Sequence, residues 1–435
     1  MRIRDFLEID FILLFASLVL MVIGILFVYS SGVTSEGVLI SGEYRRQIVW
    51  CAIGFLIALV IAIFNYRRIY DLSVYLYIGT LLLLLYTSIF GRVVHGTRWL
   101  RLGSFGIQAS EFAKITTILF LSWCLENTRR SRKDFTRFMI SCIIVFAPMM
   151  IVLIQPDLGT AIVFIPILIG MTYVSGISQK YITFLGFCII LTGIFLVLPL
   201  WQTSIMNNAV PVLMMLVNRR FIAACCTGLS LIAALAWYGF IRFRKPYFYW
   251  ICYVAGIFII SLGVSFAAHL VLKEYQIMRL IVFMDPNVDP RGSGWHIIQS
   301  ITAIGSGGFL GKGYLQGTQS HYRYLPEQST DFIFSILSEE WGFLGGIFVF
   351  ALFLIIILRL IRTMRITTDP FGSFILAGLV SMFAFHFFIN VGMTMGIMPI
   401  TGIPLMFVSY GGSAILSAMT GIGLALSVHV RRYQR

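Results

Sequence analysis

Carboxylates and cations gather beside glycines in one long polar stretch of an otherwise apolar sequence. The stretch holds Asp285 and Asp289 in two Asp-Pro steps, followed by a glycine run that contains Lys312. Asp-Pro steps followed by glycines are typical of turns, so turn formation alone accounts for either aspartate. The glycine run lacks the Gly-Lys-Ser/Thr ending and the preceding strand of a phosphate loop. Its backbone amides and one lysine could still cradle a pyrophosphate.

A shorter polar stretch combines two cations with an aromatic residue. It reads Gly-Thr-Arg-Trp-Leu-Arg and contains Arg98, Trp99 and Arg101. One interpretation is structural, because tryptophan commonly anchors a helix end at the membrane interface. Arginine, however, presents the fork-shaped donor that suits phosphate oxygens. Both interpretations stay open.

Charged residues also stand at the start of apolar segments. Glu111 and Lys114 are three apart, so they share a helix face and can pair. The pair would anchor the helix, line a site for an anionic lipid head, or do both. Asp157 follows the helix-breaking Pro156 and can cap the next helix, which would place a carboxylate at a cavity mouth. An ionised group at membrane depth costs about 2.5–3.5 kcal/mol, which makes these residues functional candidates.

The composition identifies the solvent of this chain as mostly lipid. Of 435 residues, 59% are apolar and only 11% charged, whereas soluble domains carry about 25% charged residues. Spans need roughly 20 apolar residues each and must be helical. We therefore predict an all-α polytopic membrane protein with about twelve spans, at Phe11–Tyr29, Ile48–Phe64, Ile69–Phe90, Phe112–Leu125, Phe138–Ile154, Thr160–Val174, Tyr181–Leu200, Phe221–Ile241, Tyr247–Leu272, Phe332–Leu358, Phe371–Asn390 and Ile403–Val430.

The charge distribution predicts the topology. The formal net charge is +14, and most basic residues fall in short loops that lie inside if the N-terminus is inside. Basic loops stay on the anionic cytoplasmic face. Both termini are therefore expected in the cytoplasm, and nucleic acid is not an expected partner.

Two segments, 91–110 and 273–331, are then extracytoplasmic. The second shows no helical periodicity until its end, and unstructured loops beyond about 15 residues are usually functional or disordered. Its aromatic and aliphatic residues favour a loop that folds back onto the bundle. Thr330 or Asp331 is expected to cap the next helix, with Glu339 and Glu340 about two turns further along.

These motifs resemble the SEDS family (shape, elongation, division and sporulation) over most of the chain. The matching stretches are Gly96–Gly103 with Gln108–Lys114, Gln155–Thr160, Asp289–Gly313, Gly317–Gln319 and Pro326–Glu340. Gly317–Gln319 and Trp295–Ser300 are closer to the elongation branch than to the division branch. The sequence departs from the family pattern at Ala109, Trp295 and Gln328–Ser329. It also carries an extra pair of spans within 221–272, beyond the usual ten.

The resemblance implies a single transmembrane domain over 1–435 that acts as a peptidoglycan glycosyltransferase. Its substrate would be lipid II, polymerised into glycan strands outside the cytoplasmic membrane beside a class B penicillin-binding protein. Asp289 takes the position of the family's catalytic candidate, and 273–331 that of the catalytic loop. The residues expected to contact substrate are Arg98, Trp99, Arg101, Gln108, Ser110, Glu111, Lys114, Asp157, Gln299, Ser300, Lys312 and Glu327.

The implied mechanism is an inverting transfer with Asp289 as general base. A neutral sugar hydroxyl needs a carboxylate within hydrogen-bond reach, which is worth about 10²–10⁴-fold. Arg98, Arg101, Lys114 and Lys312 are candidates to stabilise the leaving pyrophosphate, with Mg²⁺ or Mn²⁺ as a candidate cofactor. Two rival functions remain, a lipid II flippase and a non-catalytic scaffold for a cell-wall synthase.

Overall fold

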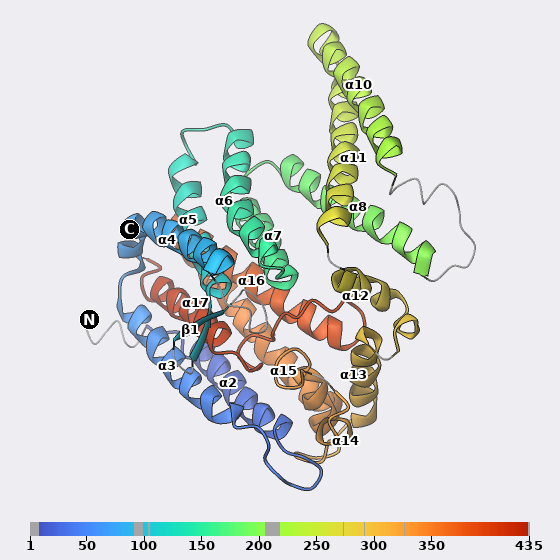
Figure 1. The fold of residues 1–435 in the computed structure, drawn as a ribbon. Helices are drawn as coiled ribbons and strands as arrows, with labels where there is room; N and C mark the ends of the chain where they lie inside the picture. Colours follow the sequence, from blue (N-terminus) through green and yellow to red (C-terminus); the bar gives the residue numbers. More distant parts are fainter. Residues whose placement is uncertain are drawn as a thin grey trace. The chain divides into compact units, whose positions relative to one another are not determined.

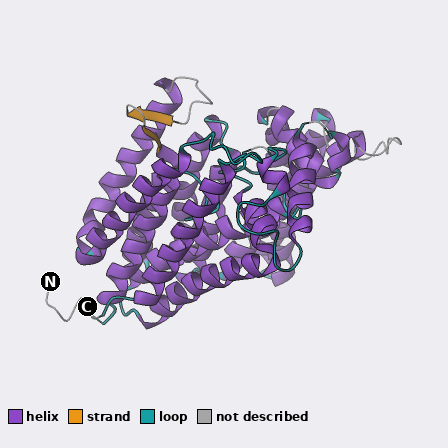
Figure 2. Cartoon of the chain, turned by 90° about the horizontal axis from the view of Figure 1, so that it is seen from below, coloured by secondary structure: helices purple, strands orange, loops and turns teal. Residues whose placement is uncertain are grey.

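The computed structural model describes residues 8–90, 99–102, 105–204, 218–272, 274–290, 292–325 and 327–433. Helices make up almost all of the regular structure, and one short β-hairpin is the exception (Figures 1 and 2). The contacts divide the chain into two compact units, one of Met1–Ile177 with Gln299–Arg435 and the other of Ser178–Ile298. Whether these form the single domain expected from the sequence stays a prediction.

The first unit holds most of the helices and the hairpin. Its elements are α2 (Phe11–Ser31), α3 (Glu43–Ile63), η1 (Tyr66–Arg68), α4 (Ile69–Phe90), β1 (Trp99–Leu102), β2 (Phe105–Gln108), α5 (Ala109–Thr128), α6 (Asp134–Ile154), α7 (Leu158–Val174), α14 (Thr318–His321), α15 (Ile333–Ile366), α16 (Pro370–Thr394) and α17 (Gly412–Val430). The second unit contains α8 (Gln179–Ser204), α10 (Arg219–Phe243), α11 (Pro246–Val271), α12 (Glu274–Met284) and η2 (Pro286–Val288). Helix α13 (Ser293–Gly307) begins in the second unit and continues into the first.

The predicted multi-pass membrane fold is confirmed. Each of the twelve expected apolar segments contains a helix, and ten of the described helices are long and apolar enough to cross a membrane. The other two are α5, which carries buried charges, and α7, a shorter apolar helix. The expected pair at 221–272 corresponds to α10 and α11, which pack side by side (Figure 1). The count of twelve spans stays a prediction.

Helix α17 forms the centre of the first unit. Its residues are buried almost without exception, and α3 packs along it. Gly423 permits that approach, because a Cβ there would lie 2.8 Å from the carbonyl oxygen of Ala58. Small residues are what membrane helices use for such close backbone contacts. The expected last helix was too long, however. Residues 403–411, which include Pro404 and Gly411, are non-helical, and α17 begins at Gly412.

Polar contacts distinguish the two ends of the first unit. At one end, which we call the basic end, Arg359 Nε donates to Asp10 Oδ2 at 2.7 Å and Arg67 pairs with Asp369. At the other, the hairpin end, the backbone N–H of Gln108 donates to Ser413 Oγ at 2.8 Å. The 19 residues of α17 run between them, a length of about 28 Å at 1.5 Å per residue.

About half of segment 273–331 is helical, so the expected lack of helical periodicity before its end was wrong, whereas its role as an extracytoplasmic catalytic loop stays a prediction. It contains α12, α13 and α14. Glycines lower the helix propensity of α13 and hide it from a pattern search. The buried residues Ser300, Ala303 and Gly307 nevertheless recur at helical spacing, so tertiary packing stabilises the helix.

Helix α15 breaks within the bundle, at Gly342. This residue has φ 64° and ψ −161°, a conformation that is essentially restricted to glycine. Residues 307–313 satisfy the groups exposed at the break. The carbonyls of Gly308 and Phe309 accept from the N–H groups of residues 343 and 344, and the N–H groups of residues 312 and 313 donate to the carbonyls of Glu339 and Glu340. The helix starts after Phe332 without a side-chain cap, so the expected caps Thr330 and Asp331 were wrong.

Replacing Gly342 tests this break. We expect Gly342→Ala to lower the free energy of unfolding by about 1–3 kcal/mol from backbone strain. The loss should be larger if residues 307–313 cannot move, because the new Cβ would lie 2.2 Å from the backbone nitrogen of Gly311. Unfolding in mixed micelles measures the change. Gly346→Ala, four residues along the same helix, is the control, since its Cβ meets only ordinary contacts. Equal stability of both variants would contradict the strained break.

Candidate functional site

Several predicted residues meet at the hairpin end of the first unit. Strand β2 leads directly into α5, which places Gln108 beside the start of α7. Gln108 Nε2 donates to Asp157 Oδ2 at 2.8 Å, and Asp157 Oδ1 accepts from the N–H of Thr160 at 3.2 Å. The predicted capping role of Asp157 is therefore confirmed. The cap also ties the hairpin to α7.

A buried charge cluster lies one turn further into α5. Lys114 Nζ donates to Glu111 Oε1 at 2.8 Å, which confirms the predicted pair, and neither side chain is more than 3% exposed. His386 of α16 completes the cluster, with its Nε2 3.0 Å from Lys114 Nζ. Its Nδ1 lies 3.2 Å from the carbonyl oxygen of Pro404, so Nδ1 carries the proton and Nε2 accepts from the lysine. His386 was not among the residues predicted from the sequence, although a lone histidine in an apolar run is a signal.

Asp289 belongs to a glycine-dependent turn in the second unit. Its carbonyl oxygen accepts from the N–H groups of Gly292 at 3.3 Å and Gly294 at 3.0 Å. Its carboxylate lies against Gly292, where an added Cβ would be 2.2 Å from Asp289 Oδ2. Asp285 has a different task, because its Oδ1 accepts from the N–H of Asn287 at 2.9 Å and begins η2. Of the two aspartates, Asp285 is therefore explained by turn formation.

Glu339 is a fully buried carboxylate that organises the segment after the glycine run. Its Oε1 accepts from Lys312 Nζ at 2.8 Å and from the N–H groups of Thr318 and Gln319 at 2.8 and 2.9 Å. The N–H groups of residues 311–313 donate to carbonyls of residues 307, 339 and 340. The glycine run is therefore not an open amide cradle, and that expectation was wrong. The charge of Lys312 is likewise neutralised by Glu339.

Glu340, the neighbouring carboxylate, is held by other parts of the chain. It accepts from Ser30 Oγ of α2 and, at 3.1 Å, from the N–H of Leu315. His321 Nε2 lies 3.4 Å from Glu340, within ion-pair distance, and His321 Nδ1 donates to the carbonyl oxygen of Val33 at 2.8 Å. The Glu340 carboxylate raises the pKa of His321 above its ordinary value, against the opposing effect of burial.

The remaining predicted residues are scattered. Ser300 Oγ donates to the carbonyl oxygen of Thr394 at 2.6 Å and packs α13 on α16, while Gln299 is half-buried. Glu327 is exposed, in left-handed backbone conformation, and its carboxylate accepts from Thr330 at 3.3 Å.

The other predicted residues belong to the hairpin and the start of α5. Ser110 is buried, and its hydroxyl has no partner among the described residues. Trp99 and Arg101 lie on β1, opposite Gln108 and Gly106, and Arg98 lies outside the described residues.

The side chains of the described residues do not form a metal site. Within the described ranges, no group of three or more His, Cys, Asp or Glu residues could hold a metal ion. The carboxylates at the hairpin end are instead engaged by Lys312, Lys114, Gln108 and backbone amides. No step is therefore assigned to a divalent cation.

Comparison with known proteins places the whole chain in one family. The profile of the cell cycle protein family of FtsW, RodA and SpoVE matches residues 11–220 and 209–434. The peptidoglycan glycosyltransferase RodA of Treponema pallidum is 47% identical over 433 residues, covering 99% of this chain and 100% of that protein. The peptidoglycan glycosyltransferase MrdB of Escherichia coli K12 is 32% identical, covering 90% and 86%. The stage V sporulation protein E of Bacillus subtilis is 32% identical, covering 98% of each chain.

Solved structures share the fold. One belongs to a peptidoglycan synthase complex studied for how it coordinates polymerization and crosslinking. It superposes with a TM-score of 0.65 and 26% identity, covering 98% of this chain and 99% of that chain. The crystal structure of the rod shape determining protein RodA of Thermus thermophilus gives a TM-score of 0.60 at 22% identity, covering 98% of each.

The contact between His321 and Glu340 predicts a pH dependence of stability. Because the folded-state pKa of His321 is raised, protonated His321 stabilises the folded protein. This stabilisation is fully present below about pH 6.5, the pKa of the unfolded state. It is lost as the pH rises through the folded-state pKa. We expect the thermal midpoint of the wild type to fall over this interval, and that of His321→Gln to fall less. Equal pH profiles of the two proteins would rule out the ion pair.

Proposed function

Because the chain belongs to the cell cycle protein family of FtsW, RodA and SpoVE, we propose that it is a peptidoglycan glycosyltransferase of the RodA type. It polymerises lipid II into glycan strands for cell elongation. Relatives that align with nearly the whole chain carry the name of this activity, which supports the proposal. The flippase and scaffold alternatives lack that support.

In the proposed reaction Asp289 acts as general base. The 4-hydroxyl of the acceptor GlcNAc loses its proton to Asp289 and attacks the anomeric carbon of the donor MurNAc. The bond to the polyprenyl pyrophosphate breaks, and the configuration inverts. The observation that carries this assignment is the turn from Asp289 to Gly294. Gly292 lies against the carboxylate, where a Cβ would be 2.2 Å from Asp289 Oδ2, so a glycine is needed there to keep the carboxylate in its position.

The leaving pyrophosphate requires cations that are not already neutralised inside the protein. Lys114 is paired with Glu111 and is fully buried, and Lys312 is paired with Glu339. Among the cations predicted from the sequence, we assign stabilisation of the pyrophosphate to Arg98 and Arg101, which flank Trp99 in the motif Gly-Thr-Arg-Trp-Leu-Arg. Arginine suits this role, because its planar group donates to two phosphate oxygens at once.

The proposed orientation places the hairpin end of the first unit outside and the basic end in the cytoplasm. Arg67, Arg359 and Arg431 all lie at the basic end, which supports this assignment. Both termini would then be cytoplasmic. The proposed partner is a class B penicillin-binding protein, because a structural neighbour belongs to a complex that couples polymerization with crosslinking.

Lipid transport is a second candidate, favoured by one observation. Glu111, Lys114 and His386 are three ionisable groups in mutual contact and buried among the helices, and proton-coupled transporters use such buried chains. Purified protein in detergent separates the two functions. A polymerase makes glycan from added lipid II there, whereas a flippase makes none.

Replacing Asp289 tests the general base. We expect Asp289→Asn to fold normally and to lose about 10²–10⁴-fold in the rate of polymerisation, because an amide cannot accept the proton. Gel analysis of glycan chains made from lipid II by the purified protein, with and without its partner, measures the rate.

The matched control is Asp285→Asn, four residues earlier, at the cap of η2. Asparagine caps as well as aspartate does, so this variant should retain wild-type polymerisation. A near wild-type rate for Asp289→Asn would show that another group takes the proton. Equal loss in both variants would point to the turn's structure instead.

Gly292→Ala tests the position of the carboxylate without changing its chemistry. The new methyl group would overlap Asp289 Oδ2, and the short side chain must turn away. A misplacement of about 1 Å costs on the order of 10²-fold, so we expect a loss of that size with unchanged thermal stability. Gly263→Ala in α11, where a Cβ meets open space, is the control. Wild-type polymerisation by Gly292→Ala would show that the position of the Asp289 carboxylate in this turn does not matter for the reaction.

A further inference from the structure

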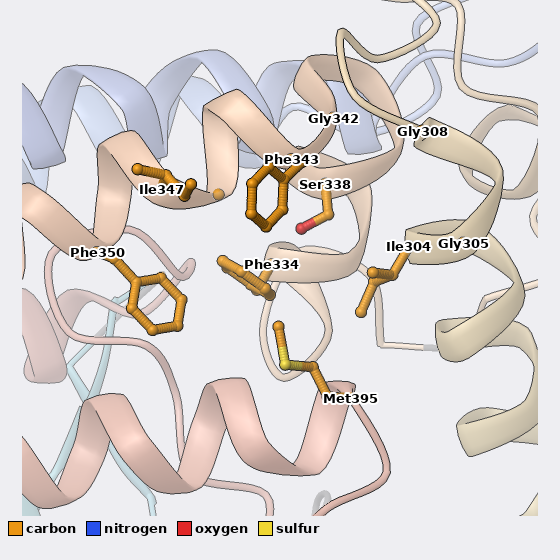
Figure 3. Close-up of a pocket in the computed structure, with 11 residues that line it drawn as sticks. Ile304, Gly305, Gly308, Phe334, Ser338, Gly342, Phe343, Ile347, Phe350 and Met395 are labelled. Carbon is orange, nitrogen blue, oxygen red and sulfur yellow. The ribbon is translucent and has the colours of Figure 1, made fainter.

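An apolar pocket lies where α15 breaks, between α13 and the end of α16. Its volume is about 350 Å³, within the range of about 300–1,000 Å³ that ligand pockets have. Figure 3 shows Phe334, Phe343 and Phe350 of α15, Ile304 of α13 and Met395 after α16 around the cavity. None of the described residues that line it is charged, and Ser338 contributes the one hydroxyl group.

The mouth of the pocket opens on the lipid-facing side of a membrane span. Phe343, Ile347 and Phe350 are 58%, 48% and 38% exposed, although α15 is one of the most apolar helices of the chain. In a bilayer the medium outside these side chains is hydrocarbon. The occupant is therefore a hydrocarbon chain, since a polar ligand would find neither charge nor water there.

The pocket also lies close to the polar boundary of the hairpin end. Ser338 directly precedes Glu339, the carboxylate that binds Lys312 and the N–H groups of residues 318–319. Residues 307–313 pack against the break in α15 that forms one wall. A chain in the pocket would therefore carry its head group at the level of these loops.

We infer that this pocket binds the polyprenyl chain of the lipid-linked substrate, an inference that rests on the proposed function. A polyprenyl diphosphate carries a single chain on its head group, and one cavity receives one chain. A glycerophospholipid carries two chains on one head group and would have to separate them.

Photocrosslinking in nanodiscs tests the site directly. The probe is a diazirine-bearing polyprenyl diphosphate, and the crosslinked peptides are identified by mass spectrometry. We expect labelling on α15 between residues 334 and 350 and on α13 near residue 304. Unlabelled polyprenyl diphosphate should suppress the labelling, whereas phosphatidylglycerol at the same mole fraction should not. Labelling elsewhere, or equal suppression by both lipids, would overturn the inference.

A side chain built into the pocket provides a second test. A Cβ on Gly346 points toward Phe334 Cζ at 3.6 Å and Ser338 Oγ at 4.0 Å, so it enters the cavity without a clash. We expect Gly346→Leu to weaken probe labelling at least about tenfold and Gly346→Ala to weaken it less. Gly79→Leu on α4, where a Cβ meets open space, should leave labelling unchanged. Labelling of Gly346→Leu at the wild-type level would also overturn the inference.

The test separates this inference from the proposed function, because labelling needs no turnover. Asp289→Asn should keep wild-type labelling while it loses polymerisation. Polymerisation by a wild type that shows no labelling in the pocket would reject the chain site alone. Labelling in the pocket of a wild type that makes no polymer would support the chain site and reject the proposed function.

Discussion

The break in α15 determines the structure at the hairpin end. Inside a bilayer no water satisfies a free N–H or C=O group, so a helix can break only where other protein groups replace its lost bonds. Residues 307–313 supply those bonds around Gly342. Their carbonyls accept from the N–H groups that follow the break, and their N–H groups donate to the carbonyls that precede it. The break therefore fixes a loop, and the loop stabilises the break. The end of α13 and one wall of the apolar pocket depend on the same exchange.

Two buried carboxylates extend this constraint to the polar segment that follows. Glu339 and Glu340 lie three and two residues before the break at Gly342 and are at most 1% exposed. A buried ionised group is tolerated only when it is paired and hydrogen-bonded. Glu339 meets that requirement with Lys312 and backbone amides of α14, and Glu340 with Ser30 and His321. These two carboxylates therefore serve as structural groups of the first unit, and the proposed general base, Asp289, belongs to the second unit.

Features that depend on residues close together in the sequence were predicted correctly. The length of apolar runs identified the helices, spacing of three residues predicted the Glu111–Lys114 pair, and a Pro-Asp step predicted the cap at Asp157. Contacts between distant residues escaped prediction. Lys312 was expected to face a phosphate, but its partner Glu339 stands 27 residues away, and His386 is 272 residues from Lys114. Neither separation produces a periodic signal, because the fold alone brings such residues together.

The neutralised lysines also bear on how the enzyme would distinguish its substrate from bulk lipid. With Lys114 and Lys312 paired internally, the proposed head-group contacts reduce to arginines, which bind any phosphate. Selection by the chain cannot rely on the hydrophobic effect, since the bilayer is as apolar as the pocket. It would rely on packing. An apolar void forfeits dispersion contacts with its lining, and a chain of matching width restores them, whereas a mismatched chain restores fewer. A pre-formed cavity on a rigid helix break therefore provides selectivity that a charged surface would not.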